Sequence, residues 1–214
     1  MGTRGLWGFK KQVLHNDYYH KVTYNHMDSY PSWLGSKVVR FVQETDTETL
    51  RQICDKIILV DQDFPANQEQ IDECKQFANS GVDDGKWDNW YVLLRETQGC
   101  PELYRDTDLR YMINGFALLS DLMCEYAYII NVSDEVLEVR VPDYAQDLIV
   151  VAMKIKFETI RGETTQETVD RISEYLALRY GCPLIKYSEC NPFAEVSFPA
   201  SLKNLNIVTD DATY

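Results

Sequence analysis

Apolar and polar positions alternate with a period of two at the start of the chain, which is typical of β-strands. In the strand predicted over residues 3–10, Trp7 and Phe9 fall on one side. Residues 15–17 (HND) include Asn and Asp, which are typical of turns, and residues 18–25 predict the return strand. The sequence therefore predicts an N-terminal β-hairpin.

The middle of the chain changes to the three-to-four-residue spacing of amphipathic helices. Ser36 and Thr47 are the expected N-caps of two helices. Further helices are predicted over residues 67–78 and 87–95, with Trp87 on the apolar face of the second. Residues 102–121 are expected to form short helices.

The clearest strand pattern comes later, over residues 125–131, 136–141 and 148–160. Residues 164–167 (TTQE) form a capping box that predicts the start of a last helix, and Gly181 is its expected end. This order of elements predicts an α+β fold. Its sheet is expected to be mainly antiparallel, built from the N-terminal hairpin and the central three-strand unit, and packed with helices.

The chain of 214 residues contains no Pro/Gly/Ser-rich linker and no internal repeat. We therefore expect a single domain over residues 1–208 and a frayed tail over residues 209–214. No apolar run approaches the roughly 20 residues of a membrane span, so a cytoplasmic protein is expected (in the host cytoplasm if it is phage-encoded). The six cysteines form no CxxC pair, and we interpret them as reduced, mostly structural thiols.

The formal charge of −13 is unevenly distributed. Residues 1–40 hold six basic and two acidic side chains, a charge of +4, so the remaining chain carries −17. Such an acidic body argues against nucleic-acid binding, because neutralisation of phosphates supplies most of that affinity. It fits either plain solubility or docking on a basic protein partner.

Residues 24–31 (YNHMDSYP) are the densest group of reactive side chains, placed between a predicted strand and a predicted helix. The predicted ligand-binding residues are Arg4, Tyr24, Asn25, Ser29 and Tyr30.

The predicted catalytic residues are His26, Asp28 and Cys124. An imidazole beside a cysteine stabilises the thiolate, and a carboxylate orients the imidazole. His26 is then the general base, Asp28 its orienter and Cys124 the nucleophile, although a lone cysteine of this kind is more often a core residue. Ser29 is a weaker nucleophile candidate, because no Gly-x-Ser-x-Gly elbow surrounds it and a turn role suits it better.

Neither a metal site nor any other cofactor is predicted. Along an extended strand, His20 and His26 lie about 20 Å apart, too far for one ion. His15 falls in the turn, and no HExxH, CxxC or EF-hand pattern is present.

Several segments resemble a family of uncharacterised bacterial and phage proteins. They are residues 1–6 (MGTRGL), 24–31 (YNHMDSYP), 34–35 (LG), 90–95 (WYVLLR), 98–99 (QG) and 124–130 (CEYAYII). The resemblance covers the chain to about residue 141. It implies a shared fold with that family.

A more distant resemblance, in layout alone, is to N-terminal-nucleophile hydrolases, especially glutamine-amidotransferase domains. These also begin with a strand at residue 2 and turn through a His/Asp/Ser-containing loop after the first hairpin. Their nucleophile is the Cys, Ser or Thr exposed by removal of the first methionine. Gly2 occupies that position here, and Thr3 comes one residue too late. The resemblance then implies a binding protein, or an enzyme that uses another residue such as Cys124.

Two alternative functions are therefore expected. One is hydrolysis or group transfer at an amide-type bond of a small-molecule or peptide substrate, in a pocket around residues 24–31. The other is a non-catalytic interaction or inhibitor protein whose acidic body docks on a basic partner.

Overall fold

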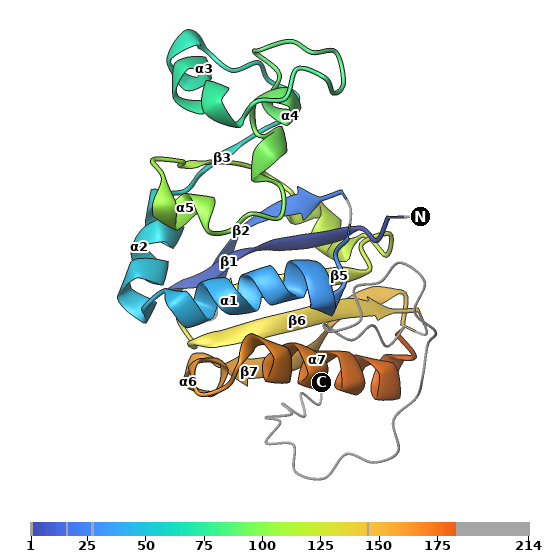
Figure 1. The fold of residues 1–214 in the computed structure, drawn as a ribbon. Helices are drawn as coiled ribbons and strands as arrows, with labels where there is room; N and C mark the ends of the chain where they lie inside the picture. Colours follow the sequence, from blue (N-terminus) through green and yellow to red (C-terminus); the bar gives the residue numbers. More distant parts are fainter. Residues whose placement is uncertain (1, 16, 27, 145, 183–214) are drawn as a thin grey trace.

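The computed structural model describes residues 2–15, 17–26, 28–144 and 146–182. The expected frayed tail, residues 209–214, lies outside the described residues, as does the last part of the expected single domain. The protein has an α+β fold with a central five-stranded sheet of order β2-β1-β5-β6-β7 (Figure 1). These strands are β1 (Gly5–Leu14), β2 (Asp17–Asn25), β5 (Tyr126–Asn131), β6 (Val136–Asp143) and β7 (Leu148–Lys156).

The sheet consists of the two predicted antiparallel units, joined by one parallel pairing. Strands β1 and β2 form the expected hairpin, and β5, β6 and β7 form the expected three-strand unit. The units meet where β1 runs parallel to β5, with Trp7 opposite Tyr128. Within the hairpin, Gly8 allows β2 to approach closely, since a Cβ there would lie 2.1 Å from the backbone oxygen of Lys21. The sheet is thus mixed but mostly antiparallel.

Helices cover one face of this sheet (Figure 1). They are η1 (Pro31–Gly35, a π-helix), α1 (Ser36–Glu44), α6 (Phe157–Arg161) and α7 (Thr165–Tyr180). Trp7, Phe9 and Tyr128 are fully buried in the main hydrophobic core, together with side chains from α1 and α7. The faces predicted for β1 are therefore confirmed.

The ends of the helices follow local hydrogen bonding. The capping box at Thr164 starts α7 as predicted, and Gly181 ends it with a left-handed φ of 64°. Ser36 does not cap α1, because the preceding residues are already helical. The cap of α2 (Thr47–Lys56) is Asp46 rather than Thr47, since the Asp46 carboxylate accepts from the Thr49 amide.

The third predicted strand of the central unit ends earlier than expected. Strand β7 stops at Lys156, and the next residues form α6 instead of continuing to residue 160. Phe157 and Ile160 are both buried at a spacing of three residues, which suits one turn of helix better than a strand.

Residues 57–115, here called the excursion, leave the sheet after α2 and lie at the top of Figure 1. Two short strands, β3 (Ile58–Val60) and β4 (Tyr111–Ile113), pair in parallel, which the sequence did not predict. The remaining elements are α3 (Gln68–Cys74), η2 (Lys75–Phe77), α4 (Trp90–Leu93), η3 (Arg95–Thr97) and α5 (Leu103–Asp106).

The predicted helix over residues 87–95 is shortened to α4. The side chain of Asn89 accepts from the Tyr91 amide and caps the helix there. Trp87 therefore stays in the preceding loop, where 49 % of it is exposed, instead of packing beside the buried Trp90.

The second face of the sheet carries a smaller apolar cluster of Leu6, Val22, Cys124, Ala127 and Ile129. The 3-10 helix η4 (Phe116–Ser120) lies against this cluster through Leu118 and Leu119. The five cysteines in the described part of the chain are all free thiols, in line with the sequence interpretation.

Candidate functional site

A cleft of about 330 Å³ opens where the end of β2 and the segment after it face the excursion. One wall comes from the predicted segment and from η1 and α1: Asn25, His26, Asp28, Trp33, Leu34 and Lys37. The other comes from the excursion: Asn79, Val82, Arg95, Glu96, Gln98, Gly99 and Cys100. Three of the predicted site residues, Asn25, His26 and Asp28, therefore line one cavity.

A tight contact at Gly99 holds the two walls together. Gly99 has a left-handed φ of +67°, and a Cβ there would lie only 2.8 Å from Oδ1 of Asn25. Asn25 is buried and donates from Nδ2 to Oγ of Ser29 at 2.9 Å. The Tyr128 hydroxyl in turn donates to the backbone oxygen of Ser29 at 3.0 Å. These bonds anchor the floor of the cleft to the centre of the sheet.

His26 and Asp28 stand exposed above this anchored floor. Asp28 adopts a left-handed φ of 55°, and its backbone oxygen accepts from the Leu34 amide at 3.2 Å. The imidazole of His26 packs edge-on against the Tyr24 ring, with 6.0 Å between centroids. Within the described residues, neither the imidazole nor the Asp28 carboxylate makes a hydrogen bond. Both groups are exposed, so a ligand can reach them.

The remaining charged groups of the cleft come from α1 and η3. Arg95 donates from Nη1 to Oε1 of Gln98 at 2.6 Å, and Glu96 accepts from Nδ2 of Asn79 at 2.7 Å. The Lys37 ammonium lies 5.8 Å from the centroid of the Trp33 ring. The cleft thus presents two cations, Lys37 and Arg95, beside the imidazole.

Cys100 is the cysteine that lines this cleft. Burial raises the pKa of its thiol, and the nearby Lys37 only partly opposes this. A raised pKa keeps the thiol protonated at neutral pH, whereas the nucleophilic form of cysteine is the thiolate.

Cys124 lies outside this lining, in the small cluster on the second face of the sheet. It is buried, and burial together with Asp121 raises the pKa of its thiol to about 11. Arg4 and Tyr24 lie close to Cys124. The charge of Arg4 opposes the rise of the Cys124 pKa. Burial raises the pKa of the Tyr24 hydroxyl, and Cys124 adds to this rise. This environment is that of a structural cysteine, and it does not favour the predicted nucleophilic role.

Ser29 and Tyr30 hold the loop in place. Ser29 is fully buried, and its Cβ and Oγ crowd against Gly5, where any side chain would collide. The Tyr30 ring packs on Tyr126 at 6.0 Å between centroids. Both residues shape the loop from behind the cleft.

Sequence reasoning missed the whole wall contributed by the excursion. Arg95, Glu96, Gly99 and Cys100 were not among the predicted site residues. Their place opposite His26 depends on packing between segments about 70 residues apart in the chain, and no local pattern records it.

No three His, Cys, Asp or Glu side chains of the described residues gather in a way that could hold a metal ion. Among the same residues, no helix has the length and apolar character that a membrane crossing requires.

Comparison of the chain with models of known families, with curated proteins and with solved structures gives no match. The resemblances drawn from the sequence motifs therefore stay predictions.

Proposed function

We propose that the cleft is the active site of a hydrolase that cleaves an amide-type bond, with His26 as general base. The observation that carries this proposal is that the His26 imidazole, which makes no hydrogen bond within the described residues, shares one cleft of about 330 Å³ with two cations. A concave site with convergent polar groups is the expected place for a small-molecule or peptide substrate.

Water is the nucleophile that fits this site best, because Cys100 is kept as a thiol and Cys124 lies outside the cleft lining. His26 takes a proton from the water molecule while its oxygen attacks the carbonyl carbon. Lys37 and Arg95 stabilise the negative charge that develops on the carbonyl oxygen. The imidazolium then returns the proton to the leaving nitrogen, which departs as the amine. Asp28, on the same wall, stabilises the imidazolium.

A panel of aminoacyl and dipeptidyl p-nitroanilides tests the proposal. We expect slow but saturable hydrolysis of some members, and His26→Gln should lower kcat/KM by about 10²–10⁴-fold. Lys37→Met should lower it less, and Cys124→Ser should leave it nearly unchanged. His15→Gln is the matched control, because His15 lies at the far end of the hairpin. Full activity in His26→Gln, or no turnover of any member, contradicts the proposal.

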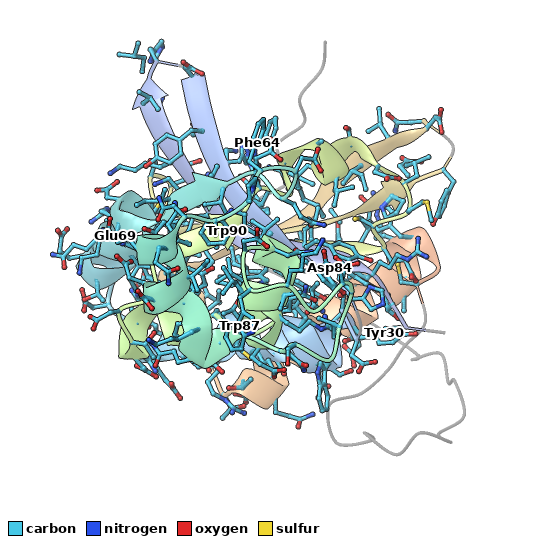
Figure 2. All side chains as sticks on the ribbon, turned by 90° about the horizontal axis from the view of Figure 1, so that it is seen from above. Tyr30, Phe64, Glu69, Asp84, Trp87 and Trp90 are labelled. Atoms are coloured by element: carbon cyan, nitrogen blue, oxygen red, sulfur yellow. The ribbon has the colours of Figure 1, made fainter. Side chains whose placement is uncertain are left out.

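The alternative function, docking on a basic partner, is supported by the surface of the excursion. Residues 57–115 contain twelve acidic and five basic residues, about half of the net charge in little more than a quarter of the chain. Phe64 is 68 % exposed and Trp87 49 % exposed on its loops (Figure 2). Phe64 directly follows the exposed Asp63, and Trp87 lies between the exposed Lys86 and Asp88. The Ala66 amide donates to the Asp88 backbone oxygen at 2.7 Å, which ties the two loops together.

Exposed aromatic side chains commonly serve as anchors in interfaces, and surrounding charge steers association. Under this alternative, a Lys/Arg-rich peptide should bind in a manner that weakens with salt, and Phe64→Ser with Trp87→Ser should weaken it further. Leu178→Ser on α7, also an exposed apolar residue, is the control. This alternative is contradicted if neither the Phe64→Ser, Trp87→Ser variant nor the Leu178→Ser control changes the binding of the peptide.

A further inference from the structure

Charged side chains gather on the second face of the sheet, beyond its small apolar cluster. Glu138 and Arg140 on β6 stand opposite Ile129 and Ala127 of that cluster, so all four residues share this face. Lys10 on β1 and His20 on β2 stand opposite each other in the hairpin and continue the same face. The group of Lys10, His20, Glu138 and Arg140 is called the sheet-face cluster below.

Glu138 is the centre of this cluster. It is fully buried and accepts from Lys10 at 2.8 Å and from Arg140 at 2.5 Å. Burial alone would raise the pKa of Glu138, but the two cations outweigh it and lower this pKa to about 2. Two cations therefore surround one carboxylate, and Lys154 stands opposite Glu138 in the register of β7. The cluster carries excess positive charge in a protein of net charge −13.

Two nitrogen atoms of the cluster are buried and find no hydrogen-bond partner in the described part of the protein: Nε2 of His20 and Nε of Arg140. The Arg140 atom can only donate, and neutral His20 can carry its proton on Nε2. Buried donors without a partner are rare in folded proteins, because they lose their hydration and gain nothing in return. The side chains of Lys10 and Arg140 retain 16 % and 15 % exposure, which leaves access for a small solute.

From these observations we infer that the sheet-face cluster is a binding site for a small oxyanion, a carboxylate or a phosphate. The orphaned nitrogens of His20 and Arg140 would donate to its oxygens, and the excess positive charge would offset its negative charge. This site is separate from the cleft, because none of its residues lines that cavity.

The ring of His20 provides a direct readout. Burial, together with Arg140 and Lys10, lowers the pKa of His20 to about 4, and its ring packs against Phe116 at 5.4 Å between centroids. An anion bound beside it would favour the protonated imidazole. Occupation of the site should therefore raise the pKa of His20.

The experiment is an NMR titration of the His20 imidazole with inorganic phosphate and, separately, with acetate, at constant ionic strength maintained with sodium chloride. We expect saturable binding and a rise of the His20 pKa, with Arg140→Gln weakening binding at least tenfold. Arg51→Gln is the matched control, because Arg51 is also paired with a glutamate but lies on α2. Comparison of the two anions distinguishes a phosphate site from a carboxylate site.

His20→Gln provides a second variant if Arg140→Gln does not fold. It replaces the rigid ring that positions the proposed donor by a flexible amide, without changing the charge at neutral pH, and should weaken binding severalfold, measured by calorimetry. Absence of saturable binding, binding that Arg140→Gln and His20→Gln both leave unchanged, or an equal loss in Arg51→Gln overturns the inference.

Discussion

The two faces of the central sheet are built on opposite principles. On the helix-covered face, Trp7 and Phe9 of β1 enter a large apolar core, whereas on the other face Lys10 of the same strand reaches a buried glutamate. Burial of apolar surface is non-directional and tolerates an approximate fit. A buried charge, in contrast, destabilises the fold when one of its ion-pair or hydrogen-bond partners is removed. The comparison teaches that the first face supplies most of the stability, and that the second limits which side chains the sheet accepts.

The largest effect is expected on the apolar face. Trp7→Ala removes a fully buried indole and should lower the free energy of unfolding by about 4 kcal/mol. Trp7→Phe is the matched control and should cost much less, because Nε1 of Trp7 has no hydrogen-bond partner among the described residues and loses none. Chemical denaturation measures both. A Trp7→Phe variant as unstable as Trp7→Ala would contradict the apolar interpretation of this face.

A slightly smaller loss is expected on the charged face. Glu138→Ala leaves the partly buried Lys10 and Arg140 without their carboxylate and should cost about 3 kcal/mol. The triple variant Lys10→Met, Glu138→Leu, Arg140→Met should recover most of that loss, since the energetic cost of desolvating the three charges is removed together with the charges. Denaturation of the single and triple variants decides. If the triple variant is less stable than Glu138→Ala, the charged side chains themselves stabilise the fold, and the proposed difference between the two faces is contradicted.

The charged face should also give the stability a specific pH dependence. His20 titrates near 6.5 when unfolded but at about 4 in the fold, so the unfolded chain binds more protons between these values. Stability should therefore be complete above pH 6.5 and fall as the pH drops toward 4. Denaturation midpoints across this range, compared between the native chain and His20→Gln, measure it. An identical pH profile in the variant would remove His20 as the cause.

The smallest effect concerns the helix that covers the apolar face. Thr164→Ala removes the capping box of α7 and should cost about 1 kcal/mol. Thr164→Ser, which keeps the hydroxyl, should cost only a small part of that. Equal losses in the two variants would show that the cap is not the source of the effect.

The parts of the fold that local patterns specify were predictable. Alternation located the hairpin and the three strands of the central unit, and the capping box located α7. The excursion was not predictable, because β3 and β4 are three residues each and their pairing joins segments about 50 residues apart. Short strands carry too few positions for a period to emerge.

The candidate site was predictable only in part, for the same reason. The composition of residues 24–31 identified part of one wall of the cleft, namely Asn25, His26 and Asp28. It could not distinguish side chains that face a ligand from those that hold the loop, such as Ser29, which is buried against Gly5. Lys37 comes from α1 and Arg95 from η3 of the excursion, and only tertiary packing brings the two together in the cleft.

One NMR titration tests the central claim, that the cleft around His26 is the functional site, most directly. The chain has three histidines, so His15 reports on the hairpin turn, His20 on the sheet-face cluster and His26 on the cleft. With a dipeptide amide as ligand, the account predicts a saturable shift of the His26 imidazole resonances, while those of His15 and His20 stay in place. An unchanged His26, or a response confined to His20, would contradict it.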